Sequence, residues 1–168
     1  FTGMDSYIHA FESNETIYQN SFSKHLSDLT IKLCNQIFNS NNMMSDKNLE
    51  KLMLASYFGG LSIAYSTVGI VHPFSAGLSV VFGTKHCLAN CIVLNKLHEF
   101  YPKNHKVFNK FLKKQNIILP KNICKNISNN KLSQLYEATI MHEKPLKNAL
   151  GINYKKILTF AKVSEIFK

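Results

Sequence analysis

Apolar residues recur at helical spacing along nearly the whole chain, and this periodicity restricts the fold more than any other feature. Met4, Ile8 and Phe11 stand at positions i, i+4 and i+7, and segment 26–37 repeats the spacing with leucine and isoleucine. Residues at these intervals lie on one face of an α-helix. The sequence therefore predicts amphipathic helices packed around a shared core, which is an all-α fold.

One segment departs from this pattern. Residues 66–86 are apolar, carry almost no charge and contain Gly69, Pro73, Gly77 and Gly83. Apolar runs of this kind fit either a buried strand or a buried helix, and periodicity alone leaves both open. Pro73 favours a helix that begins there, because proline is well accepted in a first turn.

Polar breaks and prolines mark the boundaries of the other predicted helices. After the break at residues 39–42, Asp46 is the expected N-cap of the next helix. The Tyr101-Pro102 pair is expected to end a helix that starts at His86. After two N-terminal helices, the predicted helices span residues 49–64, 86–100, 107–114, 132–142 and 161–167.

The size of the chain suits one domain. Its 168 residues are 45% hydrophobic, which is enough to bury one core, and no repeat or flexible linker divides residues 1–168. Lys- and Asn-rich helices make up 102–168, so we expect a functional site within 1–101. No run of about 18 apolar residues is present, so no membrane-spanning helix is expected. The sequence does not start with Met and shows no signal peptide, so we expect a processed, truncated or excised chain.

The net charge of +10 raises the question of nucleic-acid binding. All 20 basic residues are lysine, and arginine, the usual reader of guanine and phosphate, is absent. Asparagine is also frequent, as an AT-rich coding bias would produce. We therefore interpret the charge as a solvated lysine surface and expect no nucleic-acid partner.

The cysteines do not form a recognisable zinc or disulfide pattern. Cys34, Cys87, Cys91 and Cys124 include no CxxC pair. Without a secretory signal, reduced thiols and a cytoplasmic location are expected.

Four residues supply a ligand set for a divalent metal ion. Asp5 and His9 are four apart and share one helix face, although such a pair is usually a surface salt bridge. His72 lies among apolar residues, where an imidazole needs a hydrogen bond or a metal, and a satisfied core histidine is the alternative. For His86, the alternative to metal binding is a residue that only begins a helix. Three imidazoles and one carboxylate suit Zn²⁺ or Fe²⁺.

These residues fall in two motifs that resemble the iron-containing (group III) alcohol dehydrogenases. Residues 2–12, TGMDSYIHAFE, resemble the family signature TGMDxxxHAxE. Residues 69–73 and 83–90 resemble its second motif, GxxH…PHGxAN, whose two ligand histidines are fourteen apart, as His72 and His86 are here. Residues 49–56 look like the connecting helix. The resemblance covers 1–101 closely and the remainder loosely.

The resemblance implies that Asp5, His9, His72 and His86 bind Fe²⁺ or Zn²⁺. It also implies the all-helical metal-binding domain of the dehydroquinate synthase-like fold, without the N-terminal nucleotide-binding α/β domain that would bind NAD(P). The implied activity is oxidation of a small-molecule alcohol to an aldehyde, with this chain as the C-terminal half of the enzyme. A homo-oligomer is a further expectation.

Finer details resemble the members of that family that oxidise C8 of 3-deoxy-manno-octulosonate (Kdo), an anionic sugar acid of lipopolysaccharide biosynthesis. The segments concerned are 71–79, 88–91, 99–102 and 143–151. Hydroxyls of Ser75, Ser79 and Tyr65 are candidates to bind such a substrate, with packing or capping as the alternative. Lys85 and Lys96 are candidates to attract its carboxylate.

The chain also departs from the family pattern. Ala76 stands where many members have a histidine, Cys87 where glycine is usual and Lys85 where proline is frequent. A proton route through that histidine is therefore absent. Two alternatives to an enzyme remain open: an inactive remnant or fragment that binds metal, and a helical interaction module whose histidines belong to the core.

Overall fold

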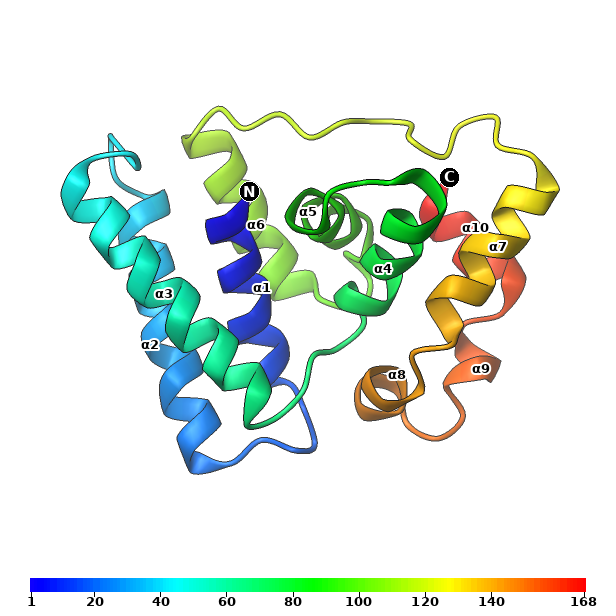
Figure 1. The fold of residues 1–168 in the computed structure, drawn as a ribbon, viewed down its shortest axis with the longest axis horizontal. Helices are drawn as coiled ribbons and strands as arrows, with labels where there is room; N and C mark the ends of the chain where they lie inside the picture. Colours follow the sequence, from blue (N-terminus) through cyan, green and yellow to red (C-terminus); the bar gives the residue numbers. More distant parts are fainter.

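The structure, a computed structural model, describes residues 1–168 as ten helices without a strand, which confirms the all-α prediction (Figure 1). Helices α1–α3 and α6 lie on one side, α7–α10 on the other, and α4 and α5 between them. None of the helices is both long and apolar enough to cross a membrane. The helices are α1 (Thr2–Asn14), α2 (Ser21–Phe38), α3 (Asp46–Ala64), α4 (Val71–Phe82), α5 (His86–Lys96), α6 (Pro102–Lys114), α7 (Asn129–Ile140), α8 (Glu143–Leu150), α9 (Tyr154–Ile157) and α10 (Phe160–Phe167).

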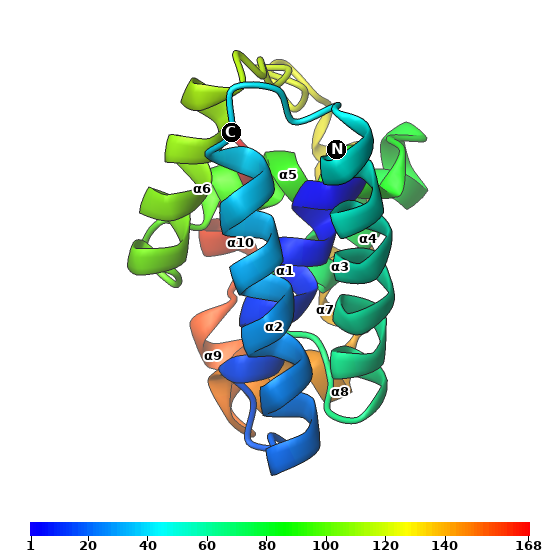
Figure 2. The ribbon, with the colours of Figure 1, turned by 90° about the vertical axis from the view of Figure 1, so that its left-hand side faces the viewer.

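Helix α1 is the central element of the N-terminal half. Figure 2 shows α2 and α3 in front of it, and both helices contact α1. The predicted apolar face of Met4, Ile8 and Phe11 is fully buried. The side chains of Asp5 and Glu12 are almost as deeply buried, at 6% and 1% exposed residue surface. A central helix that buries two carboxylates requires partners for them, and these partners define the site described below.

The segment whose structure the sequence left open is a helix. Pro73 lies in the first turn of α4, where its missing N–H would have no helical partner in any case. Gly83 ends the helix with φ +65°, a left-handed conformation that glycine adopts at no steric cost. Burial explains the apolar residues of its first two turns, because α4 packs against both α5 and α7, whereas Val80 near its end is 75% exposed.

Helices α4 and α7 approach closely at Gly77. A Cβ atom there would lie 2.5 Å from Thr139 Oγ1 and 3.2 Å from the Leu135 carbonyl oxygen. Gly77→Ala is therefore expected to lower the free energy of unfolding by about 1–3 kcal/mol. Gly60→Ala is the matched control, because nothing lies within 4 Å of its Cβ position, and it should raise stability by about 0.5–1 kcal/mol. Equal effects in urea-induced unfolding would contradict the close approach.

Some predicted boundaries were wrong. The N-cap of α3 is Ser45, and Asp46 is its first residue. Helix α5 ends at Lys96, not at residue 100, because the chain turns so that Leu97 and Tyr101 enter the core. The short helices α8 and α9 were not predicted.

Candidate metal centre

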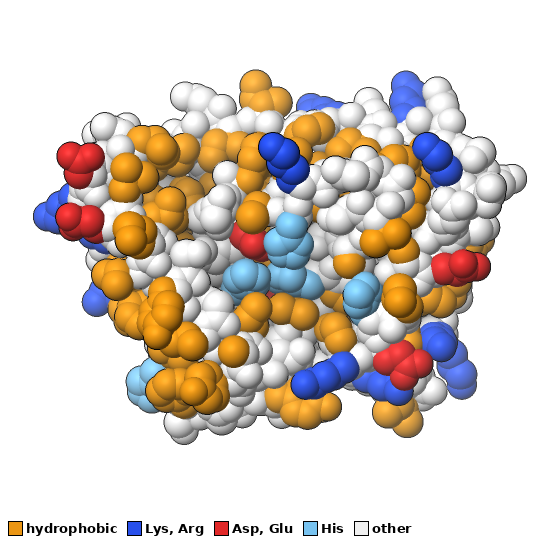
Figure 3. Space-filling view, in the orientation of Figure 1, with side chains coloured by type: hydrophobic (Ala, Val, Ile, Leu, Met, Phe, Trp, Pro, Cys, Tyr) orange, Lys and Arg blue, Asp and Glu red, His pale blue; other side chains and the backbone are white.

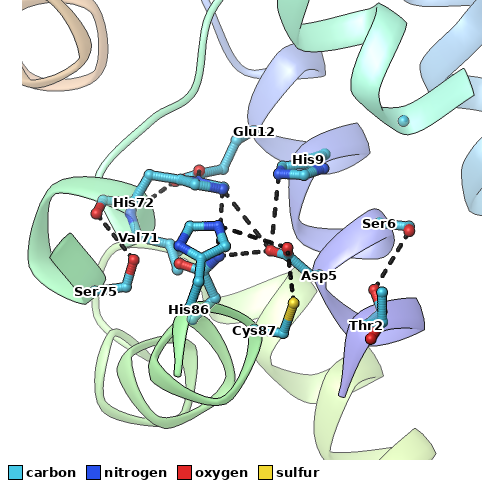
Figure 4. Close-up of polar contacts among 12 residues, drawn as sticks. Thr2, Asp5, Ser6, His9, Glu12, Val71, His72, Ser75, His86 and Cys87 are labelled. Atoms are coloured by element: carbon cyan, nitrogen blue, oxygen red, sulfur yellow. Dashed lines mark hydrogen bonds and ion pairs between the residues drawn. The ribbon is translucent and has the colours of Figure 1, made fainter. Parts of the chain in front are cut away.

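The four predicted ligands come together from three helices (Figure 4). Helix α1 carries Asp5 and His9 one turn apart, α4 carries His72 in its first turn, and α5 begins at His86. One potential ligand atom from each residue lies within 4.8 Å of the others. Residues 67 positions apart in sequence therefore meet because α4 and α5 both start beside α1.

The spacing of these atoms suits a small divalent ion. Asp5 Oδ1 lies 3.7 Å from His9 Nε2 and 3.8 Å from His72 Nε2, and Asp5 Oδ2 lies 3.6 Å from His86 Nε2. Ligands placed at about 2.1 Å around a tetrahedral ion are roughly 3.4 Å apart, so the three separations between Asp5 and the histidines are close to those of a bound ion. Three imidazole nitrogens and one carboxylate fit Zn²⁺ or Fe²⁺ chemically.

The centre is closed on one side and open on the other. The side chains of Asp5, His72 and His9 are 8%, 12% and 18% exposed, whereas that of His86 is 55% exposed. Histidine side chains gather in the middle of the face shown in Figure 3, beside an acidic side chain. Burial lowers the pKa of His9 to about 4, partly offset by the Asp5 carboxylate, so its ring is neutral and its lone pair is available.

A buried carboxylate that sequence reasoning did not select holds His72. Glu12 Oε2 lies 2.5 Å from His72 Nδ1, and Glu12 Oε1 accepts from the backbone N–H of Val71 at 2.7 Å. When Nδ1 donates to Glu12, the Nε2 lone pair is left to face Asp5 and the Asn90 amide nitrogen. Glu12 stands seven residues after Asp5 on the same face of α1, and this spacing was the signal in the sequence that could have identified it.

Tyr101 and Gly69 complete the surroundings of Glu12. The Tyr101 hydroxyl donates to Glu12 Oε1 at 3.2 Å and accepts from the Ile70 N–H at 3.0 Å. Burial and the Glu12 carboxylate raise the Tyr101 pKa well above its ordinary value, so the phenol keeps its proton. A Cβ at Gly69 would lie 2.3 Å from this hydroxyl, so only glycine fits here.

Two further side chains of α5 contact Asp5. Asn90 Nδ2 donates to Asp5 Oδ1 at 2.5 Å, and the Cys87 thiol donates to Asp5 Oδ2 at 3.4 Å. Neither residue was predicted to belong to the site. Their i, i+3 spacing, directly after His86, places both on the face of α5 that meets α1.

The other candidate residues contribute less to this centre. The Ser75 hydroxyl is buried and donates to the His72 carbonyl, so the packing alternative holds there. Tyr65 is 55% exposed and packs edge-on against Phe22. Lys85 is exposed directly before His86. Lys96 lies at the other end of α5, about 15 Å from His86 along the axis, and lines a separate hollow of about 450 Å³.

The cysteines agree with the predicted reduced state. All four are free, and Cys34, Cys91 and Cys124 are buried. Burial raises the pKa of Cys34 and of Cys91 to about 12, so both thiols stay protonated. Only Cys87 is partly exposed.

In this all-helical domain, a carboxylate and three histidines converge from α1, α4 and α5 into a group that could hold a metal ion. Residues 1–164 match the family model described as "Fe-containing alcohol dehydrogenase family, C-terminal". The chain therefore belongs to this family. The family implies a metal ion, and the residues gathered here fit one.

Solved structures share the fold. An iron-containing alcohol dehydrogenase from Thermotoga maritima superposes with a TM-score of 0.75 at 22% identity, over 98% of this chain and 46% of its own. Another iron-containing alcohol dehydrogenase superposes with a TM-score of 0.73 at 22% identity, with the same coverage of both chains. A 1,3-propanediol oxidoreductase gives 0.72 at 15% identity, over 98% of this chain and 49% of its own. The chain therefore spans about half the length of these proteins.

Proposed function

We propose that this chain is the metal-binding half of an alcohol oxidoreductase, in which Asp5, His9, His72 and His86 hold Fe²⁺ or Zn²⁺. The observation that supports this most is the convergence of the four ligand atoms within 4.8 Å, in a chain of this family. A core-histidine interaction module is less consistent with the structure, because His86 is 55% exposed and faces a buried carboxylate.

The reaction proposed is oxidation of a primary alcohol to an aldehyde, with hydride passing to NAD(P) bound by a second domain. A bound divalent ion would polarise the substrate hydroxyl and lower its pKa. The chain's own contribution is to orient the ligands: Glu12 fixes the His72 ring, and the exposed side at His86 leaves room for a substrate. With Ala76 one turn after His72, no histidine at that position relays a proton.

For the substrate we propose an anionic sugar acid, with C8 of Kdo as the first candidate. The support is the sequence resemblance of segments 71–79, 88–91, 99–102 and 143–151, together with an exposed Lys85 next to the centre. Lys96 is too distant to take part. Other small primary alcohols are the comparison substrates.

The test is hydride transfer by these residues together with a nucleotide-binding domain encoded upstream. Metal-dependent reduction of NAD⁺ or NADP⁺ by a primary alcohol is the expected result, faster with Kdo than with a neutral alcohol of similar size. Metal bound without any reduction would instead indicate the alternative, a remnant that retains the site without turnover. An upstream reading frame that lacks a strand, glycine-rich loop and helix would point the same way.

A further inference from the structure

We propose that Asn90 and Cys87 form a clamp that fixes the Asp5 carboxylate in the orientation in which it binds a metal ion. This positioning role rests on the proposed metal site. Both residues belong to α5, the helix that also supplies His86, so one helix would provide a ligand and orient another.

The clamp and the histidines contact the same two oxygens of Asp5. Asp5 Oδ1 accepts from Asn90 Nδ2 at 2.5 Å and faces the His9 and His72 nitrogens at 3.7 and 3.8 Å. Asp5 Oδ2 accepts from the Cys87 thiol at 3.4 Å and faces the His86 nitrogen at 3.6 Å. Each carboxylate oxygen has two lone pairs, so a clamp bond leaves one for a metal ion.

Stability alone does not explain why an asparagine is buried at position 90. Its side chain is fully buried, and its amide oxygen has no hydrogen-bond partner. A buried, unpartnered oxygen is unfavourable, so the contacts of the amide nitrogen must offset its cost. The amide nitrogen lies against the centre instead, 3.1 Å from His86 Nε2 and 3.3 Å from His72 Nε2. These contacts indicate that the Asn90 side chain positions the residues of the metal site rather than stabilising the core.

Four variants of the whole chain test the clamp by Zn²⁺ affinity, measured in competition with a chelator, and by thermal unfolding of the metal-free form. Asn90→Leu should weaken Zn²⁺ binding about 10- to 100-fold, as loss of a group that orients a ligand does. Its metal-free melting temperature should also fall, because the buried Asp5 carboxylate loses a donor, so the Zn²⁺ affinity is compared only among variants that fold. Asn95→Leu, at an exposed position of the same helix, should change neither value.

Two variants of Cys87 test the clamp independently of Asn90. Cys87→Ala removes the donor and should weaken Zn²⁺ binding, whereas Cys87→Ser keeps a hydroxyl donor and should restore it. The Co²⁺-loaded parent should show no thiolate-to-metal charge-transfer band. Such a band, lost in Cys87→Ser, would make Cys87 a ligand and overturn its role as a donor.

The remaining outcomes are decisive in the same way. Unchanged Zn²⁺ affinity in a folded Asn90→Leu variant would overturn the clamp, as would a Cys87→Ser variant that binds Zn²⁺ no better than Cys87→Ala. If Asn90→Leu does not fold, equal affinities of Cys87→Ala and the parent would overturn it instead. A folded parent chain that binds no metal would refute the proposed function itself, and the clamp with it.

Discussion

His72→Ala is expected to abolish retention of the metal ion while leaving the fold intact. His72 supplies one of four ligands, and it lies between His9, stacked at 4.9 Å between ring centroids, and His86, at 5.6 Å. Structural zinc sites with four ligands bind with about 10–16 kcal/mol, so one ligand is worth roughly 3 kcal/mol, or more than about a hundredfold in affinity. Elemental analysis after dialysis should find no bound metal in the variant.

The matched control is His25→Ala, at an exposed histidine of α2 whose ring contacts only the Ser21 carbonyl in its own helix. This variant should keep the full metal content of the parent. Full occupancy in His72→Ala, with circular dichroism unchanged, would remove His72 from the proposed ligand set.

Glu12→Ala is expected to produce the largest loss of stability. The carboxylate accepts hydrogen bonds from the Val71 N–H, the Tyr101 hydroxyl and His72 Nδ1, and its side chain is fully buried. Its removal leaves three donors without an acceptor in the core, at a cost of about 3–5 kcal/mol. The melting temperature of the metal-free chain should fall by roughly 10 °C.

Glu15→Ala is the control for this effect. Glu15 lies one turn further along the chain, is exposed and accepts from the Asn104 amide. Its loss should cost less than about 1 kcal/mol. Similar melting temperatures for the two variants would contradict the role assigned to the Glu12 network.

The apolar face was predictable for α1 but not for α2, where Leu29 is 40% exposed and Ser27 and Thr30 are buried instead. Met4, Ile8 and Phe11 are buried as their spacing predicts. The segment that forms α4 was ambiguous because it is buried against two neighbours, which makes it apolar on nearly every side and removes the periodic signal. The end of α5 was misplaced because Tyr101 enters the core to reach Glu12, a tertiary contact that local sequence does not reveal.

The site was predictable to a similar extent. Asp5 and His9 share a helix turn, so their proximity follows from spacing alone. The approach of His72 and His86 to them depends on how α4 and α5 pack, and the sequence indicated it only through family resemblance. Glu12 and Asn90 contact ligands rather than acting as ligands, and nothing in their residue type distinguishes them from ordinary polar residues.

The most direct test of the account is the metal content of the purified chain, prepared under reducing and anaerobic conditions and measured by elemental mass spectrometry. We expect about one Fe or Zn per chain, lost in Asp5→Ala and in His86→Ala. A chain that is folded by circular dichroism but takes up neither metal would contradict it.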